Sequence, residues 1–311
     1  MTTGPRRMDA CVIYNPAAGR GRTRRLIRRL GRQAAGRFDF RATGGPGGGA
    51  ATVEAAIAAG HTTVIAAGGD GTVHEVANGI LRAGRPDVVF GVWPAGSAND
   101  YAYALNVGAD WPLWPDWQKR LSVVRADVGR VSGGGRERFF VNGLGVGFNA
   151  SVTLEAHGIR RLRGMALYGV AFVRAVWKHF VSPRLVLTFD GTSGELETLA
   201  LTISLGKREG GFLVTPKAEL DDGWFDYVHA GRLGRLEALR MLPRIATGTL
   251  PDDHPLIRQR RCRSVRVQGE SPLRVHTDGE FFCLTDDNVR EIMVELLPGA
   301  LPVLCGRKSR R

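Results

Sequence analysis

The chain of 311 residues has no long apolar run and no closely spaced cysteines. No segment reaches the roughly 18 consecutive apolar residues that a membrane-spanning helix needs. The four cysteines stand far apart without a C-x-x-C pair, which argues against a zinc site or a disulfide framework. The N-terminal residues also lack the apolar stretch of a secretory signal. We therefore expect a protein of the reducing cytosol.

Lysine is scarce, and arginine carries most of the positive charge. The 43 basic residues include only 5 lysines and stand against 30 acidic ones, which gives a net charge of +13. This charge suits phosphorylated ligands or an anionic membrane face. A GC-rich genome would give the same arginine content, so both interpretations stay open. Nucleic acid is not expected as a partner, because no helix-turn-helix, RNA-binding or zinc-finger pattern is present.

Several common catalytic motifs are missing as well. The sequence has no G-x-x-x-x-G-K-[ST] phosphate loop, no H-E-x-x-H and no G-x-S-x-G. These absences argue against P-loop enzymes, zinc metalloproteases and serine hydrolases. The segment from Gly145 to Ala150 partly matches the G-x-G-x-x-G/A fingerprint of dinucleotide-binding proteins, but it lies in a β-rich region without a clear crossover helix. We therefore assign no nicotinamide site there.

The first part of the chain alternates strand-like and helix-like segments. The expected strands cover residues 10–14, 38–42, 62–67 and 88–92, and the expected helices cover 20–35, 50–59 and 72–82. Such alternation implies right-handed crossovers and a mostly parallel sheet. Ligands of these sheets bind beyond the carboxyl ends of the strands, so the loops that follow the strands are the places to search for function.

The pattern changes near residue 125. Short β-type runs separated by Gly and Asp turns cover 125–148 and 184–228, and one helix is expected around 162–181. This pattern favours a β-sandwich or meander. The stretch 291–304 is strand-like and suited to return to the first sheet. We predict an α/β domain over residues 1–128 with 291–311, and a β-sandwich domain over 129–290.

The most glycine-rich motif lies between an expected strand and an expected helix. It reads Gly68-Gly69-Asp70-Gly71-Thr72. Glycines allow a ligand to approach the backbone closely, and a helix N-terminus offers free N–H groups to phosphate. A carboxylate beside phosphate is repulsive unless a cation such as Mg²⁺ bridges them. The loop therefore predicts a metal–phosphate site, although Asp70 could also simply cap the helix.

A second loop of small residues follows the next expected strand. It contains Gly96, Ser97, Asn99 and Asp100, and neighbouring loops of a parallel sheet open onto the same edge. Asp70 and Asp100 are therefore candidates for one shared site. A third turn, from Asn15 to Gly19, follows the first expected strand.

The motifs together resemble those of a known family. They run in order along the chain as Asn15-Pro16 with Gly19, GGDGT at 68–72, Glu75 with Asn78-Gly79, P-x-G-S-A-N-D at 94–100, FVNGLGVGFNA at 140–150, GGF…P…LDDGWFD at 210–226, and DGE at 278–280. GGDGT alone is shared with NAD kinases, whereas the later motifs favour lipid kinases. The chain thus resembles the bacterial diacylglycerol-kinase-like lipid kinases, which are related to sphingosine and ceramide kinases.

The resemblance implies ATP-dependent phosphorylation of a lipid hydroxyl, with an N-terminal ATP-binding domain followed by a β-sandwich domain. By motif position the nucleotide contacts are Asn15, Thr43, Gly68, Gly69, Asp70, Gly71, Thr72, Glu75, Gly96, Ser97 and Asn99. The implied general base is Glu280. The implied Mg²⁺ ligands are the Asp222 side chain and the backbone carbonyls of Glu219 and Trp224.

The chemistry is consistent with these carboxylates. An alcohol must lose its proton as the phosphoryl group is transferred, and a carboxylate such as Glu280 can accept it. Mg²⁺ would offset the charge on the transferring oxygens, with Asp70, Asp100 and Asp127 as candidates to hold the metal or its waters. The plain alternatives are a turn residue in an Asp-Gly hairpin for Glu280 and a structural hydrogen bond for Asp127.

A lipid substrate also requires contact with a bilayer. Residues 159–181 combine Arg and Lys with Trp, Phe and Leu, a composition that suits an anionic membrane interface. A helix packed on the β-sandwich would have a similar composition. We expect a cytoplasmic protein with peripheral membrane association, and a homodimer stays open. The alternatives are NAD phosphorylation and a catalytically silent lipid- or nucleotide-binding regulator. The lipid itself is not identified by the sequence.

Overall fold

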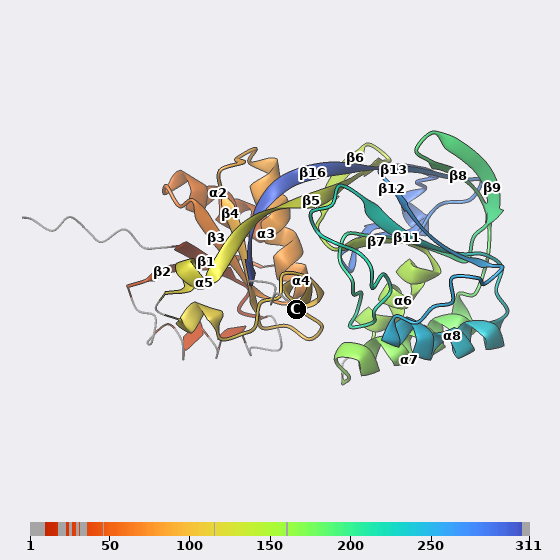
Figure 1. Cartoon of the computed structure of the whole chain (residues 1–311), viewed down its shortest axis with the longest axis horizontal. Helices are drawn as coiled ribbons and strands as arrows, with labels where there is room; N and C mark the ends of the chain where they lie inside the picture. Colours follow the sequence, from red (N-terminus) through yellow and green to blue (C-terminus); the bar gives the residue numbers. More distant parts are fainter. Residues whose placement is uncertain are drawn as a thin grey trace, which may run out of the picture. The chain divides into compact units, whose positions relative to one another are not determined.

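The computed structural model describes residues 10–17, 23–24, 27–28, 31, 36–45, 47–114, 116–159 and 161–306 (Figure 1). The chain divides into two compact units, here called unit 1 (Met1–Ala126 with Ala300–Arg311) and unit 2 (Asp127–Gly299). The helix expected over 20–35 falls largely outside the described residues, as does Gly19. Within the described ranges, no helix combines the length and the hydropathy needed to cross a membrane.

Unit 1 contains the expected parallel sheet. Its strands are β1 (Ala10–Tyr14), β2 (Phe38–Ala42), β3 (Thr63–Gly68) and β4 (Val89–Pro94), in the order β2-β1-β3-β4. The end of β16 (Glu291–Gly306) adds a parallel strand, because Val303 pairs with Phe90. The predicted class of the N-terminal part, a mostly parallel α/β fold, is confirmed.

Helices α2 (Gly49–Ala58) and α3 (Asp70–Arg82) contact each other in unit 1. Val73, Val76 and Ile80 of α3 are buried at helical spacing, which explains why the sequence predicts this helix. Two short helices, α4 (Asp100–Ala104) and α5 (Trp117–Arg120), follow β4 along the chain.

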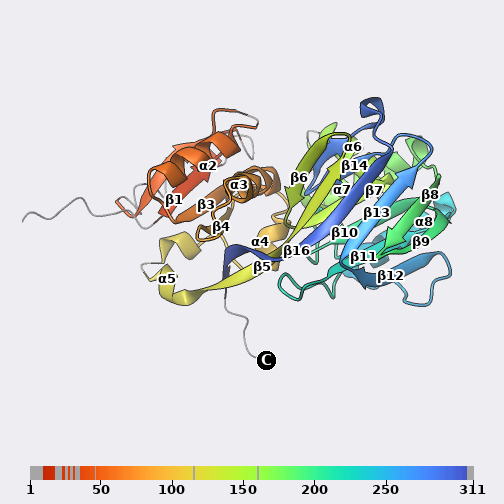
Figure 2. The same cartoon turned by 90° about the horizontal axis from the view of Figure 1, so that it is seen from above.

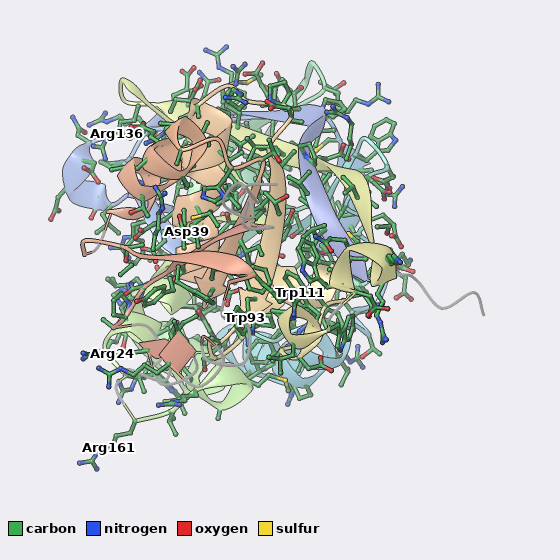
Figure 3. The ribbon with its side chains drawn as sticks, turned by 90° about the vertical axis from the view of Figure 1, so that its left-hand side faces the viewer. Arg24, Asp39, Trp93, Trp111, Arg136 and Arg161 are labelled. Atoms are coloured by element: carbon green, nitrogen blue, oxygen red, sulfur yellow. The ribbon has the colours of Figure 1, made fainter. Side chains whose placement is uncertain are left out.

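Tryptophans fill part of the core of unit 1. Trp93 and Trp111 are completely buried, and their indole N–H groups donate hydrogen bonds to the backbone carbonyls of Ala109 and Val92 at 2.9 and 2.8 Å (Figure 3). Buried indoles need such acceptors. This core supports the strand β4 that carries the second predicted loop.

Unit 2 contains two antiparallel sheets. One has the order β12-β11-β10-β7-β14-β15 and consists of β7 (Gly143–Gly147), β10 (Ala200–Ser204), β11 (Phe225–Ala230), β12 (Ile257–Cys262), β14 (Val275–Thr277) and β15 (Glu280–Cys283). The other has the order β16-β13-β8-β9, in which β13 is Ser264–Gly269, β8 is Arg184–Phe189 and β9 is Thr192–Glu197 (Figure 2). The strand β5 (Leu121–Gly133) pairs with β16 and also with β6 (Arg136–Phe140).

Aromatic side chains join the two sheets of unit 2. Phe189 of β8 stacks on Tyr227 of β11 with ring centroids 4.3 Å apart, and Phe140 of β6 stacks on Phe225 of β11 at 5.7 Å. These contacts place the sheets face to face, so the predicted β-sandwich is confirmed.

The prediction of a single helix in this part is wrong. Besides α7 (Gly164–Lys178), which lies within the expected range 162–181, the unit contains α6 (Phe148–His157) and α8 (Arg235–Thr247). The polar and small residues of α6 and the internal Pro243 of α8 obscured their helical pattern. The three helices lie on the same side of the sheet that contains β7 and β11 (Figure 1).

Candidate active site

The loops after β3 and β4 pack against each other in unit 1. A Cβ atom at Gly96 would collide with the Cα atom of Gly69, and one at Gly68 would collide with the side chain of Thr72. The Ala95 N–H donates to the Gly68 carbonyl at 2.8 Å. The glycines are therefore required where the two loops meet, at the carboxyl edge of the parallel sheet.

Asp70 connects these two loops. Its Oδ2 accepts the backbone N–H of Asn99 at 2.9 Å, and its Oδ1 accepts that of Asp100 at 2.8 Å. Asn99 has a left-handed backbone (φ 53°), and its own Oδ1 accepts the Gly96 N–H at 2.9 Å. The structure thus brings Asp70 and Asp100 together as the sequence predicts, but through the backbone of Asp100. The Asp70 carboxylate orients the second loop.

The N-terminus of α3 faces the same edge. No side chain caps it, since the residue before the helix is Gly69. Uncapped N–H groups and the positive end of a helix dipole are suited to binding phosphate. Thr72 is buried beneath this turn, and Ser97 is exposed in the adjacent loop.

Glu75 anchors a further glycine-rich segment. Its two carboxylate oxygens accept the backbone N–H groups of Gly47 and Gly49, each at 3.0 Å. A Cβ atom at Gly49 would meet the Glu75 side chain. The contacts of Glu75 hold the segment that leads into α2, and its role as a nucleotide contact stays a prediction.

Thr43 and Asn15 lie just beyond the ends of β2 and β1. The Thr43 N–H donates to the Tyr14 carbonyl at 2.9 Å, whereas its buried hydroxyl finds no partner in the described part of the chain. A buried hydroxyl without a partner is costly, so a ligand atom at this edge would satisfy it. The Asn15 Oδ1 accepts the Ala17 N–H at 2.9 Å and shapes the turn after β1.

The DGE turn of unit 2 contains two carboxylates with different surroundings. Asp278 accepts backbone N–H groups of Val141, Asn142 and Gly143 at 3.1, 2.9 and 3.0 Å. Glu280 is exposed, and among the described residues its carboxylate forms no hydrogen bond or ion pair. Asp278 therefore fixes the turn that presents Glu280. Sequence reasoning named Glu280 and missed Asp278, although the adjacent Gly279 (φ 87°) is the signal of a tight turn.

The LDDGW turn carries a concentration of carboxylates. Asp222 accepts the Trp224 N–H at 3.2 Å through Oδ1 and pairs with Arg261 at 3.1 Å through Oδ2. Asp226 also pairs with Arg261, at 3.3 Å, and its other oxygen is buried without a hydrogen bond to any residue that the structure describes. Burial raises the pKa of Asp226, although Arg261 opposes this effect. Glu219 pairs with Lys207 at 3.3 Å.

The Asp127 side chain is hydrogen-bonded to the backbone of the same turn. Its oxygens accept the N–H groups of Gly223 and Gly299 at 2.7 and 2.8 Å, which is the structural alternative considered for this residue. Burial raises its pKa, the two backbone hydrogen bonds lower it, and the negative charges of Asp222 and Asp221 raise it again. The turn therefore offers oxygen donors of the kind that Mg²⁺ takes, and Asp226 Oδ2 has no hydrogen-bond partner among the described residues, so the turn fits this cation in donor chemistry.

An apolar cavity of about 130 Å³ lies in unit 2 between the sheet and its helices. Its wall includes Phe148, Val152, Phe172, Leu199, Val228, Met241, Leu242 and Ile257. Four polar residues interrupt this wall: Asn149, Thr153, Thr202 and Glu209. Sequence reasoning missed this cavity, because its residues come from β10, β11, α6, α7 and α8, which are distant in sequence.

The glycines of the GLGVG segment have a structural role beside this cavity. A Cβ atom at Gly145 would collide with the imidazole of His276, which is buried and lies 3.0 Å from Glu209. Gly147 has a positive φ of 77° where β7 turns into α6. A helix does follow this segment, which corrects the sequence interpretation, but His276 fills the space that the first glycine leaves open.

Comparisons with known proteins match both units. Residues 9–131 match the diacylglycerol kinase catalytic domain, and residues 143–305 match the YegS C-terminal NAD kinase beta sandwich-like domain. A "Diacylglycerol kinase" of Staphylococcus saprophyticus is 28% identical over 283 residues, covering 88% of this chain and 90% of that protein. A Pseudomonas aeruginosa protein named "Probable lipid kinase YegS-like" is 29% identical over 313 residues, covering 94% and 92%.

A solved structure shares the fold. The crystal structure of a diacylglycerol kinase from Bacillus anthracis strain Sterne superimposes with a TM-score of 0.69 at 18% identity, over 96% of this chain and 97% of that chain. This similarity concerns the fold alone. The matched domains span nearly the whole chain and carry the motifs described above, and the chain therefore belongs to the family of diacylglycerol kinase catalytic domain and YegS-like lipid kinases.

Proposed function

We propose that this protein transfers the γ-phosphoryl group of ATP to the hydroxyl of a diacylglycerol-like lipid. Family membership implies ATP as the donor. The proposal of a lipid acceptor rests on the apolar cavity of unit 2, the unit that also contains the exposed Glu280. A cavity of this size is comparable to cavities that bind benzene-sized apolar ligands, and each methylene buried in it would contribute about 0.8 kcal/mol.

The nucleotide is assigned to unit 1. Its phosphates would lie at the uncapped N-terminus of α3, where Gly68 and Gly69 allow close approach to the backbone. Asp70 holds the neighbouring loop with Ser97 in place for the same ligand. The Thr43 hydroxyl, which is buried and has no hydrogen-bond partner among the described residues, is a further candidate contact.

The acceptor is assigned to unit 2. Glu280 would accept the proton of the lipid hydroxyl while the hydroxyl oxygen forms a bond to the γ-phosphorus. The bond between the γ-phosphorus and the bridging oxygen breaks, and ADP leaves with that oxygen. Mg²⁺ would be held at the LDDGW turn by the Asp222 carboxylate and the carbonyls of Glu219 and Trp224. When bound, such a cation offsets negative charge near the transferring phosphoryl group.

The membrane contact is assigned to helices α7 and α8. The exposed large apolar side chains concentrate on and next to them: Leu162, Met165, Val170, Val173, Trp177, Val181 and Leu236. Exposed cations at Arg161, Arg163, Arg174 and Lys178 surround this face, and residues 159–181 include no acidic residue. Arg161 extends away from the ribbon (Figure 3). An anionic phospholipid surface complements both features, and the same helices cover the cavity.

An acceptor screen tests the function. Purified protein is incubated with labelled ATP and Mg²⁺ together with diacylglycerol, monoacylglycerol, phosphatidylglycerol, a sphingoid base or NAD⁺. Label in a lipid phosphate, lost in Glu280→Gln, is the expected result. Glu270→Gln is the matched control, because Glu270 is also an exposed glutamate of unit 2. Label in NADP⁺ alone would favour NAD phosphorylation. No label in any acceptor, with ATP still bound, would favour the silent regulator.

A further inference from the structure

A cysteine, an aspartate and a histidine meet in unit 1, away from the residues used above. The potential ligand atoms of Cys11, Asp39 and His61 all lie within 4.8 Å of one another. It is the one such group of three or more His, Cys, Asp and Glu side chains in the described part of the chain. The proposed phosphoryl transfer uses none of these residues.

The parallel sheet itself creates this arrangement. Cys11 of β1 and Asp39 of β2 are register partners on adjacent strands, so their side chains lie next to each other on one face. His61 stands just before β3, the neighbour of β1 on its other side. All three therefore lie at the amino ends of the strands. The nucleotide loops follow the carboxyl ends, roughly 13 Å further along β1.

The three residues differ in burial. The Cys11 residue is fully buried, whereas the side chains of Asp39 and His61 are 28% and 14% exposed. The His61 Nε2 lies 3.2 Å from Asp39 Oδ2, and the Arg41 Nε donates to the same oxygen at 2.7 Å. Asp39 Oδ1 accepts no hydrogen bond from the described residues. Among the described residues, one carboxylate oxygen is thus available to a ligand while Arg41 fixes the other.

We propose that Cys11, Asp39 and His61 bind a thiophilic divalent cation of the Zn²⁺ class. Thiolate, imidazole and carboxylate are the ligands that Zn²⁺ takes, whereas Mg²⁺ and Ca²⁺ require oxygen donors. Three protein ligands leave the fourth tetrahedral position to water. Arg41 supplies the hydrogen bond that a metal-ligating carboxylate usually receives from its surroundings.

Metal uptake here must release a proton. Binding replaces the S–H bond by a sulfur–metal bond, and the proton passes to solvent. The bound cation would join β1, β2 and the segment before β3, so its expected effect is on the stability of unit 1.

Cobalt provides the direct test. The full-length protein is stripped of metal and titrated with Co²⁺, and the wild type is expected to develop a thiolate-to-cobalt charge-transfer band with one equivalent bound. His61→Gln should weaken binding by about 100-fold or more, and Cys11→Ser should remove the band. Cys305→Ser is the control, since this cysteine is outside the cluster. No band in the wild type, or an unchanged band in Cys11→Ser, would overturn the proposal.

A second measurement covers the case in which Cys11→Ser does not fold. His61 and Asp39 are partly exposed, so His61→Gln and Asp39→Asn are expected to keep the wild-type circular dichroism spectrum. Zn²⁺ should raise the melting temperature of the wild type and leave that of both variants unchanged. An equal rise in folded His61→Gln and in the wild type would contradict the assignment.

Discussion

The Asp70 carboxylate holds Asp100 through its backbone, with Oδ1 accepting the Asp100 N–H at 2.8 Å. The second oxygen accepts the N–H of Asn99. One side chain thus sets the position of the loop after β4 relative to the N-terminus of α3. Both loops border the place assigned to the phosphates, so their relative position matters for nucleotide binding.

Asp70→Asn is expected to disturb this arrangement. An amide offers one acceptor oxygen, and its NH₂ group would face a backbone N–H that has lost its partner. We expect a loss of about 1–3 kcal/mol in the free energy of unfolding. The value of kcat/KM for ATP should fall by a factor of about 10 to 100. Asp87→Asn is the control, because Asp87 is exposed and pairs with Arg85 on the same turn. Unchanged kinetics in Asp70→Asn would remove its positioning role.

The two carboxylates of the DGE turn should behave differently on substitution. Glu280→Gln is expected to reduce kcat by about 10² to 10⁴, the usual contribution of a general base, with no change in melting temperature. Asp278→Asn should lower both, because three backbone N–H groups depend on that carboxylate. Steady-state kinetics and thermal unfolding of the pair separate the roles. Full activity in Glu280→Gln would reject Glu280 as the base.

Local patterns explain why much of unit 1 could be predicted from its sequence. The strand β3 is a buried β-branched and alanine run, and Gly68 and Gly69 mark its end. Parallel strands place successive loops at one edge, so the proximity of the loops with Asp70 and Asp100 follows from topology. What did not follow was the donor in each hydrogen bond. Sequence spacing does not show that the Asp70 carboxylate accepts the backbone N–H groups of Asn99 and Asp100.

Unit 2 was predicted less completely, because its features depend on contacts distant in sequence. The cavity is formed by side chains such as Phe148, Val228 and Met241, which come from different elements. Pro243 inside α8 reads as a helix breaker, and only the packed structure shows that the helix continues through it. The three backbone partners of Asp278, at 141–143, lie 135–137 residues before it in the sequence, so no local pattern indicates its role.

Filling the cavity should affect the lipid and spare the nucleotide. Ala238 of α8 is buried and lines the cavity, so Ala238→Leu would occupy part of its space. We expect KM for a long-chain diacylglycerol to rise about tenfold or more, with KM for ATP unchanged. Ala246→Leu is the matched control, on the same helix but outside the cavity lining. An equal effect of both variants would argue against the cavity as the acyl site.

The apolar face of α7 should control membrane binding. Val173→Asp introduces a negative charge among exposed apolar and basic residues, so binding to vesicles rich in phosphatidylglycerol should fall about tenfold or more. Val123→Asp is the matched control, because Val123 is an even more exposed valine in unit 1. Flotation at low and high salt provides the readout, and wild-type binding should weaken as salt rises. Equal loss in both variants would locate the contact elsewhere.

The buried imidazole of His229 should cause the protein to lose stability in mild acid. Burial, with a smaller effect from Arg258, lowers the pKa of this imidazole from 6.5 to about 4, and its Nε2 lies 3.1 Å from the Thr198 hydroxyl. Between these pH values the unfolded chain binds a proton that the folded chain does not. Stability is therefore present above pH 6.5 and lost as the pH falls toward 4, by roughly 3 kcal/mol at most.

Urea unfolding of the wild type and His229→Gln between pH 7.5 and about 4 measures this loss. The variant has no titrating group at this position, so the difference in unfolding free energy between the two proteins should shrink steadily below pH 6.5. His157→Gln is the control, because His157 is exposed on α6 and its replacement should leave the pH dependence of the wild type intact. Parallel curves for the wild type and His229→Gln would show that the folded protein takes up the proton at His229 as readily as the unfolded chain does.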